Sequence, residues 1–253
     1  MFKLIIFDLD GTITESKSKI DREMSRLISR LLRRKKVAVI SGGSFAQFKL
    51  QFLPGLAAKK DELRNLYIFP TNSTSLYIYK GVPACRQAGW RRVYEEPLIK
   101  REKQKIMRAF KIALREINYS QPPKIYGPVI EDRKTQITFS ALGQRAPVPK
   151  KLLWNKKSDS RPRIMRALKK HLKGFEIRRG GLTSIDITRR GINKAYGVRR
   201  ILKYLKIKKN EAVFVGDALY PGGNDEPARR AGVKCIIVSG PIDVKKLIRK
   251  LLN

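Results

Sequence analysis

The chain has 253 residues, of which 57 are Lys or Arg and 21 are Asp or Glu, and its formal net charge is +36. Hydrophobic residues make up 42% of it, which is enough to bury a core and excludes a largely disordered chain. The longest apolar runs have the length of a β-strand, whereas a membrane-spanning helix needs about 20 apolar residues. We therefore expect no membrane span, and the acidic motif so close to the N-terminus predicts no signal peptide.

The N-terminal part of the sequence alternates between strand and helix patterns. Residues 2–7 and 37–40 are apolar runs that predict buried strands. A helical spacing of apolar residues follows each run, over about 21–32 and 44–53. This order is typical of a parallel sheet that is covered by helices on both faces.

The middle of the chain follows a different pattern. Two short strands joined by a polar turn are expected first, at 66–70 and 75–79. Later elements are a long helix, two short strands, a Pro-rich connection, a helix and two more strands, at 97–117, 129–131, 136–140, 147–149, 163–172, 175–178 and 184–188. Short strands with helices on one side indicate an α+β unit.

The C-terminal part returns to alternation. The expected order is helix, strand, short helix, strand and terminal helix, with the first four at 194–205, 212–215, 227–231 and 234–238. We therefore predict an α/β fold whose doubly wound, Rossmann-like core comprises residues 1–83 and 187–253. An α+β cap, residues 84–186, interrupts this core.

Polar side chains stand at the ends of the predicted core strands and at the start of one helix. They are Asp8, Asp10, Ser41, Lys194, Asp217 and Asp225. Because ligands bind beyond the carboxyl ends of parallel strands, we expect these side chains to lie together. Carboxylates in so small a space repel one another unless a cation lies among them. Oxygen ligands without His or thiolate favour a hard ion, most simply Mg²⁺.

This set of groups is suited to phosphoryl transfer. An ionised Asp8 can attack phosphorus and form an aspartyl-phosphate, while Asp10 can exchange protons with the leaving and entering oxygens. Ser41 and the backbone N–H of Gly42 can hold a phosphoryl oxygen, and Lys194 can offset its charge. Ser41 and Asp225 could instead cap the helices that follow them.

Four segments resemble the motifs of the haloacid dehalogenase (HAD) superfamily, in that family's usual order. They are Asp8-Leu9-Asp10-Gly11-Thr12, Ser41, Lys194, and Gly216-Asp217 with Asn224-Asp225. The insert is similar to the C2 cap of subfamily IIB. Residues 39–44, 181–186 and 214–225 resemble eukaryotic-type phosphomannomutases more closely, and the resemblance covers nearly the whole chain.

The resemblance implies a role for each matched core residue. Asp8 would be the nucleophile and a metal ligand. Asp10 would be the acid/base and would bind the metal through its carbonyl. The implied Mg²⁺ site comprises Asp8, Asp10, Asp217 and Asp225. The implied phosphate site comprises Ser41, Gly42, Lys194 and Asn224.

The mutases also hold a second phosphate, with an Arg near the first motif, three cap arginines and a Ser-x-Asp pair. Lys17 stands at the position of the core arginine, and Arg133 is retained in the cap. Gln144 and Lys151 stand where the other two cap arginines are expected. Ser184 and Asp186 match the sugar-binding pair. The predicted substrate-binding residues are therefore Lys17, Arg133, Lys151, Ser184 and Asp186.

The departures at these positions bear on the reaction. Lys lacks the bidentate fork of Arg, and Gln carries no charge. A weak second anion site favours a phosphatase that hydrolyses a sugar phosphate or a similar small phosphometabolite. The alternative is a phosphomannomutase, which interconverts mannose 6-phosphate and mannose 1-phosphate. A nucleic-acid-binding protein on an HAD scaffold is a remote third hypothesis, because the charge would attract polyanions.

The expected partner is a small phosphorylated substrate, and no specific nucleic acid is expected because no basic tail or RNA-binding aromatic signature is present. A homodimer through the cap is possible for this type of protein. Two cysteines cannot form a disulfide framework, which predicts the cytoplasm.

Overall fold

The computed structural model describes residues 2–16, 18–81 and 89–253. The chain divides into two compact units. The core unit comprises Met1–Glu95 and Asn193–Asn253, and the cap unit comprises Glu96–Ile192. An α/β core interrupted by an α+β insert is the predicted organisation, and the fold confirms it.

The described part of the core unit contains one sheet of seven strands, in the order β11-β10-β1-β2-β3-β4-β5. The first five strands in this order run parallel to one another, whereas β4 and β5 are antiparallel to their neighbours. The strands are β1 (Leu4–Asp8), β2 (Lys36–Ile40), β3 (Leu66–Phe69), β4 (Ser75–Lys80), β5 (Gly89–Glu95), β10 (Ala212–Gly216) and β11 (Lys234–Ile237).

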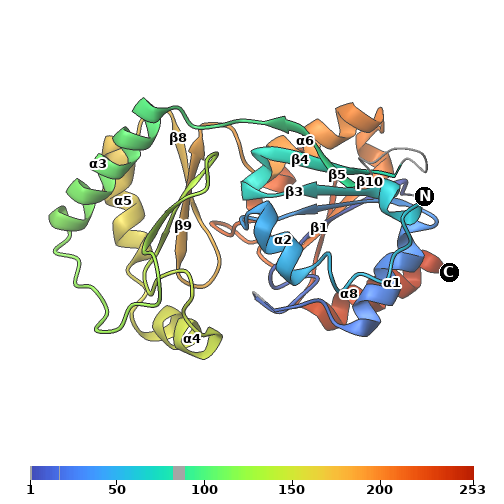
Figure 1. Ribbon diagram of the computed structural model, residues 1–253, viewed down its shortest axis with the longest axis horizontal. Coiled ribbons are helices and arrows are strands. Elements are labelled where there is room, and N and C mark those ends of the chain that lie inside the picture. The colour runs from blue at the N-terminus through green and yellow to red at the C-terminus, as the bar shows by residue number, and fades with distance from the viewer. Residues whose placement is uncertain (1, 17, 82–88) are drawn as a thin grey trace. The chain divides into compact units, whose positions relative to one another are not determined.

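Helices cover both faces of this sheet because Leu4–Phe7 of β1 and 37–40 of β2 are apolar and buried on both faces. Ile5 and Phe7 of β1 pack in one buried cluster with α1 (Arg22–Leu32) and α8 (Pro241–Leu252). Leu4 and Ile6, which point to the opposite face, pack in another cluster with α6 (Lys194–Leu205). Figure 1 shows α1 and α8 on one side of the sheet and α6 on the other. The short helices α2 (Phe45–Gln51) and α7 (Glu226–Arg229) complete the unit.

The unit boundaries lie later in the chain than the predicted ones at 83/84 and 186/187. The prediction puts residues 89–95 in the cap, whereas these residues form β5 and pair with β4 from Ser75 to Lys80. At the second boundary, β9 (Ser184–Arg189) continues past residue 186 and pairs along its length with β8 (Phe175–Arg179). Strand pairing therefore keeps each of these segments in one unit.

The described part of the cap unit contains a four-stranded antiparallel sheet, in the order β6-β7-β9-β8. Its remaining strands are β6 (Ile130–Asp132) and β7 (Ile137–Ser140). Figure 1 shows α3 (Lys100–Glu116) and α5 (Arg161–His171) on one side of this sheet. Phe110 of α3 and Phe139 of β7 stack there with ring centroids 5.6 Å apart.

A helix replaces the expected Pro-rich connection. α4 (Val148–Lys157) begins after Pro147, and Pro149 lies in its first turn. Proline is tolerated at this place because the first N–H groups of a helix have no partner within the helix. The two prolines therefore start a helix, and the prediction of an irregular connection is wrong.

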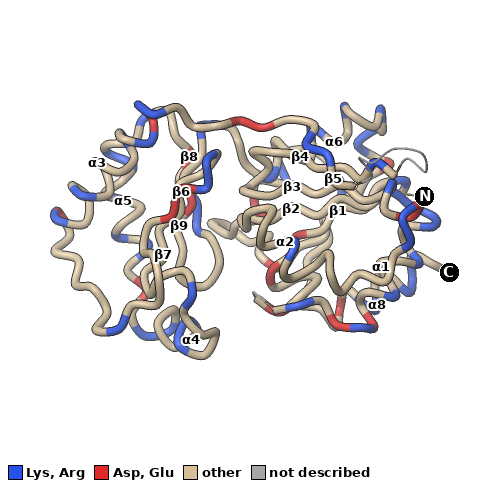
Figure 2. Tube along the Cα trace, in the orientation of Figure 1, with Lys and Arg blue, Asp and Glu red and all other residues tan. Residues whose placement is uncertain are grey.

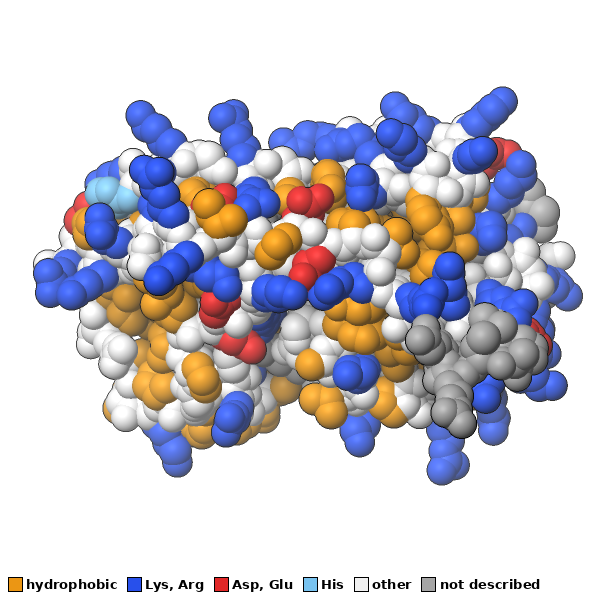
Figure 3. Space-filling view, turned by 45° about the horizontal axis from the view of Figure 1, so that its top comes forward, with side chains coloured by type: hydrophobic (Ala, Val, Ile, Leu, Met, Phe, Trp, Pro, Cys, Tyr) orange, Lys and Arg blue, Asp and Glu red, His pale blue; other side chains and the backbone are white. Residues whose placement is uncertain are grey.

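Basic side chains are distributed over both units. Figure 2 shows Lys and Arg in every part of the trace, and Figure 3 shows them scattered over the visible face. No single basic stripe of the kind that follows a nucleic-acid backbone stands out on this face. Within the described residues, no helix is both long and apolar enough to cross a membrane.

Candidate active site

Two of the predicted site residues, Asp8 and Asp217, stand where the strand order of the core sheet reverses. From β1 the chain proceeds through β2 and β3 on one side, and it returns to place β10 and β11 on the other. Asp8 is the last residue of β1, and Asp217 follows β10, which pairs with β1 from Leu4 to Phe7. Such a switch point is the usual ligand site of an open parallel sheet. The two strand ends therefore lie together, as the sequence predicts.

Lys194 lies between two buried carboxylates. It is the first residue of α6, whose start is capped by Asn193, because that side chain accepts hydrogen bonds from the N–H groups of Ala195 and Tyr196. The ammonium Nζ donates to Asp8 Oδ1 at 2.5 Å and also to Asp225 Oδ1. All three side chains are at most 2% exposed. A buried lysine at a helix N-terminus needs such partners, because the helix dipole and burial both oppose its charge.

Asp225 is held by more than the lysine. Its Oδ2 accepts a hydrogen bond from the N–H of Ala218 at 3.0 Å, and it makes no capping bond although it stands at the N-cap position of α7. The carboxylate of Asp225 therefore points into the site, and it does not cap α7.

Thr12 positions the third carboxylate, a contact that the sequence analysis did not assign. Its hydroxyl donates to Asp217 Oδ1 and accepts from the N–H of Asp217, both at 3.1 Å. Gly11 has a φ of +86°, and a Cβ there would lie 2.8 Å from Asp217 Oδ2. Gly11 thus leaves room for the Asp217 side chain, and Thr12 fixes that side chain by hydrogen bonds. In the sequence, the only signal for this contact is the Gly11-Thr12 pair that follows Asp10.

Burial governs the ionisation of this cluster. It raises the pKa of Asp8 well above its usual value, and Asp225 and Asp217 add to this effect while Lys194 opposes it. Burial, followed by the charge of Asp225, also raises the pKa of Asp217. Burial alone would lower the pKa of Lys194, but Asp225 and Asp8 outweigh it and raise that pKa. One ammonium is thus too little positive charge for three carboxylates.

The residues present fit a divalent cation. Asp8, Asp217 and Asp225 each offer an oxygen, and these oxygens lie within 4.8 Å of one another. Asp8 Oδ2 is buried and has no hydrogen-bond partner among the described residues. An all-oxygen set with an unpartnered buried carboxylate oxygen suits a hard ion such as Mg²⁺. Asp10 is not part of this carboxylate group.

Asp10 and Ser41 lie beside each other at neighbouring strand ends. The Ser41 hydroxyl donates to Asp10 Oδ2 at 3.3 Å and accepts from the N–H of Gly43 at 3.0 Å. The helix after Ser41 is capped by Ser44, whose hydroxyl accepts from the N–H of Gln47. Ser41 is therefore not the cap of α2, and its hydroxyl is turned toward the carboxylate.

The remaining predicted core residues differ in how far the structure describes them. Gly42 lies in the turn after β2, between Ser41 and the Gly43 N–H that Ser41 engages. Asn224 precedes Asp225, and its buried Oδ1 has no hydrogen-bond partner among the described residues. Lys17 lies outside the described residues.

Arg133 and Lys151 of the cap unit meet at Gln144. The Arg133 guanidinium forms a salt bridge with Glu131 at 2.7 Å and donates to Gln144 Oε1 at 3.1 Å. Lys151 Nζ donates to the backbone carbonyl of Gln144 at 3.3 Å. The side chain of Arg133 is only 6% exposed. The carboxylate of Glu131, which the sequence analysis did not single out, already offsets the charge of this arginine.

Ser184 and Asp186 point to the same face of β9. Asp186 Oδ1 accepts from the Thr138 hydroxyl at 2.9 Å, and the Ser184 hydroxyl donates to Ser140 at 3.4 Å. Their partners are opposite them on β7. The alternate residues of β7 and β9 pack in the apolar cluster of the cap. The pair thus belongs to a polar sheet face, as residues two apart on a strand must share one face.

Comparison with other proteins agrees with this geometry. A family model described as haloacid dehalogenase-like hydrolase matches residues 5–225. A Caenorhabditis elegans protein named probable phosphomannomutase is 25% identical over 259 residues, which cover 99% of this chain and 95% of that protein. Human phosphomannomutase 1 is 27% identical over 230 residues, covering 88% and 81% of the two chains.

A solved structure supports the fold. An N-terminally truncated IMP-nucleotidase from Plasmodium falciparum superimposes with a TM-score of 0.71 at 19% identity, covering all of this chain and 71% of that one. At this identity the likeness concerns the fold alone. The family match extends over most of the chain, and the described carboxylate cluster lies within the matched residues. The chain therefore belongs to the haloacid dehalogenase-like hydrolase family and is a phosphoryl-transfer enzyme.

Proposed function

We propose that the chain is a Mg²⁺-dependent phosphotransferase that isomerises a hexose phosphate, through an aspartyl-phosphate on Asp8. The observation that carries the chemistry is the buried cluster of Asp8, Lys194, Asp217 and Asp225. The similarity to phosphomannomutases over 88–99% of the chain supports the substrate class. It supports isomerisation better than the hydrolysis that the sequence analysis favours.

The two carboxylate oxygens of Asp8 differ in their surroundings. Its Oδ1 accepts the hydrogen bond from Lys194, whereas Oδ2 has no partner among the described residues. Attack by a carboxylate oxygen of Asp8 on one phosphorus of a hexose bisphosphate would form the acyl phosphate as the bond to the sugar oxygen breaks, and a hexose monophosphate would be released. Lys194 would offset the charge that develops on the transferring group, and the burial of its side chain would strengthen this interaction.

Asp8, Asp217 and Asp225 would hold the Mg²⁺. When bound, a divalent ion supplies the positive charge that keeps these carboxylates ionised and offsets that of the phosphoryl oxygens. The raised pKa values of Asp8 and Asp217 express the same need for positive charge.

Asp10 would move the protons. In the first half-reaction it gives a proton to the departing sugar oxygen, and in the second it takes one from the hydroxyl that attacks phospho-Asp8. The Ser41 hydroxyl, 3.3 Å from Asp10 Oδ2, would orient it and contact a phosphoryl oxygen. Gly42 and Asn224 are proposed as further phosphate contacts.

The acceptor in the second half-reaction separates the two candidate functions. Isomerisation needs the hydroxyl of a bound sugar phosphate as acceptor, and hence a cation that grips the second phosphate. Arg133 is already paired with Glu131 and Gln144, and Gln144 itself carries no charge. This observation favours the second candidate, a sugar-phosphate phosphatase in which water is the acceptor. Lys17, Lys151, Ser184 and Asp186 remain proposed substrate contacts in either case.

A single assay distinguishes the candidates. Mannose 1-phosphate is incubated with the protein and Mg²⁺, with and without a hexose 1,6-bisphosphate, and ³¹P NMR follows mannose 6-phosphate and inorganic phosphate. The proposal predicts isomer formation that the bisphosphate accelerates and that a chelator abolishes. Inorganic phosphate as the only product would replace isomerisation by hydrolysis, and turnover that survives the chelator would contradict the metal site.

We further propose a homodimer through the cap and a location in the cytoplasm. Light scattering coupled to size exclusion tests the first by comparing the full chain at several concentrations. A mass equal to one chain at every concentration would contradict the dimer.

A further inference from the structure

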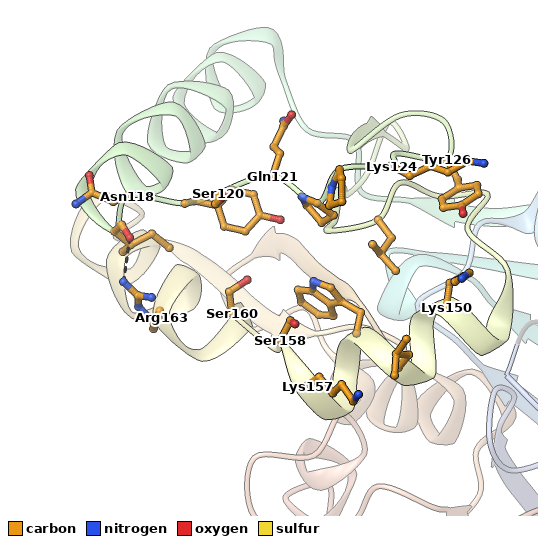
Figure 4. Close-up of a pocket in the computed structure, with 17 residues that line it drawn as sticks. Asn118, Ser120, Gln121, Lys124, Tyr126, Lys150, Lys157, Ser158, Ser160 and Arg163 are labelled. Carbon is orange, nitrogen blue, oxygen red and sulfur yellow. Dashed lines mark hydrogen bonds between the residues drawn. The ribbon is translucent and has the colours of Figure 1, made fainter.

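The cap unit contains a cavity that the proposed chemistry does not use. Its volume is about 700 Å³, within the range of about 300–1,000 Å³ that is usual for small-molecule sites. It lies between the segment after α3, the start of α5 and one side of α4 (Figure 4). Among the described residues, none of the predicted substrate contacts lines it.

The apolar part of the wall is rich in flat side chains. Trp154 and Leu153 of α4 contribute, together with Tyr119, Tyr126 and Leu142. Leu153 is 49% exposed although it lines the cavity, whereas Trp154 is 8% exposed and packs into the cap core. A surface of this kind accepts an aromatic ring by stacking and edge contacts.

All charged side chains of the wall have the same sign. Lys124, Lys150, Lys157 and Arg163 line the cavity, and no Asp or Glu is among its described lining residues. The Lys124 ammonium lies 5.4 Å from the centre of the Tyr126 ring. Arg163 donates to the carbonyl of Ile117 at 2.9 Å, which fixes it at the wall (Figure 4). The cavity therefore selects against cations and favours an anion.

Two hydroxyls of the wall lack hydrogen-bond partners. Tyr119 Oη and Ser160 Oγ are buried and unpaired among the described residues. Ser160 stands at the N-cap position of α5 but makes no capping bond, and Figure 4 shows its hydroxyl directed among the drawn side chains. Burial raises the pKa of Tyr119 to about 12, so this hydroxyl keeps its proton and can donate. Unpaired buried hydroxyls favour a ligand that carries polar atoms.

We propose that this cavity binds a small organic anion with a flat aromatic ring system. The ring would lie against Trp154 and Leu153, the anionic group would face Lys150 and Lys157, and the Tyr119 and Ser160 hydroxyls would contact its polar atoms. This site is separate from the phosphate chemistry of the core unit and does not depend on it.

The test uses 1-anilinonaphthalene-8-sulfonate, an aromatic monoanion whose emission rises in apolar sites. The full chain is titrated with excitation of tryptophan. We expect one saturable site per chain and transfer from Trp154, which a Trp154→Phe variant loses and a Trp90→Phe variant keeps. The neutral relative N-phenyl-1-naphthylamine is expected to bind more weakly, because it lacks the sulfonate.

Variants that reverse the charge of Lys150 and Lys157 test where the anionic group of the probe binds. Lys150→Glu combined with Lys157→Glu should weaken binding by at least about fivefold, since exposed charges contribute modestly. Lys156→Glu is the matched control, because this exposed lysine is on the same helix but does not line the cavity; we expect less than a twofold effect. Circular dichroism checks that each variant is folded.

Three outcomes would overturn the proposal. They are the absence of saturable binding, an equal loss in the control and the double variant, and transfer that persists without Trp154. Each of them leaves the phosphoryl-transfer assay untouched, so this site and the proposed function fail separately.

Discussion

The charged groups of the core site and those of the cap differ in how fully their partners in the protein compensate them. In the core, carboxylates and one ammonium from distant segments are turned toward each other in a buried cluster, with Asp8 Oδ2 unpaired. In the cap, Arg133 is paired with its near neighbour Glu131 and with Gln144. A group that binds a ligand must retain charge or hydrogen-bonding capacity that the protein itself does not satisfy, whereas a fully paired group stabilises the fold. The core carboxylate cluster therefore retains the capacity to bind a cation, whereas Arg133 of the cap is already paired.

The largest effect is expected from replacing Asp8, the proposed nucleophile. Asp8→Asn keeps the shape of the side chain but not its charge, so we expect phosphate transfer to fall by at least about a thousandfold. Product formation from mannose 1-phosphate measures it. Asp61→Asn, at an exposed core position, is the matched control and should retain full activity. Comparable activity in both variants would remove Asp8 from the mechanism.

The next largest effect is expected at Lys194. Lys194→Met leaves Asp8 and Asp225 buried without their cation, which should destabilise the fold by about 3–5 kcal/mol and slow turnover by about a hundredfold. Urea denaturation and kcat measure the two effects.

Lys203→Met on the same helix is the control, because Lys203 is exposed, and its effect should be small. An equal loss of stability in the two variants would mean that the buried pairs do not stabilise the fold.

Gln144 is an uncharged residue beside Arg133, where a cation can be added. Gln144→Arg adds a cation beside Arg133, so the ratio of isomer to released phosphate should rise by about threefold or more. Gln144→Glu should lower that ratio. Gln104→Arg, at an exposed position of α3, adds the same charge elsewhere in the cap. A ratio that moves equally in the two arginine variants would indicate a general charge effect.

The smallest effect concerns the stability of the cap. Burial opposes the ionisation of Asp159, but Arg161 and Arg179 outweigh it and lower its pKa below the ordinary 3.8. Its contribution is thus present above pH about 4 and is lost as the pH falls through the lowered pKa. Asp159→Asn should cost about 1 kcal/mol near neutral pH, and the difference from the wild type in urea should vanish in acid. A difference that persists at low pH would contradict this origin.

The sequence was sufficient to predict that the core carboxylates and Lys194 lie together, because these residues follow or begin regular elements. Asp8 and Asp217 are tied to buried parallel strands, and Lys194 begins a helix with a clear apolar face. Once those elements are recognised, topology brings their ends together. The hydrogen-bond partners of the site side chains were harder to predict from the sequence. For example, the contact of Thr12 with Asp217 joins residues 205 positions apart.

The middle of the chain was harder to predict because its elements depend on tertiary context. β5 is an edge strand with three exposed positions and two arginines, so its pairing with β4 outweighs a weak local pattern. α4 begins at two prolines that resemble a break. The contact of Arg133 with Gln144 joins residues 11 positions apart across a turn and two strand ends, which the sequence alone does not fix.

Chemical trapping of the phosphorylated side chain tests directly whether Asp8 is the residue that carries the phosphoryl group. The protein is mixed with substrate and Mg²⁺, quenched in acid and reduced with borohydride, which converts an aspartyl-phosphate to homoserine. Peptide mass spectrometry should then find homoserine at position 8 and unchanged aspartate at positions 10, 217 and 225. Turnover without any conversion at position 8, or conversion at another aspartate, would contradict the account.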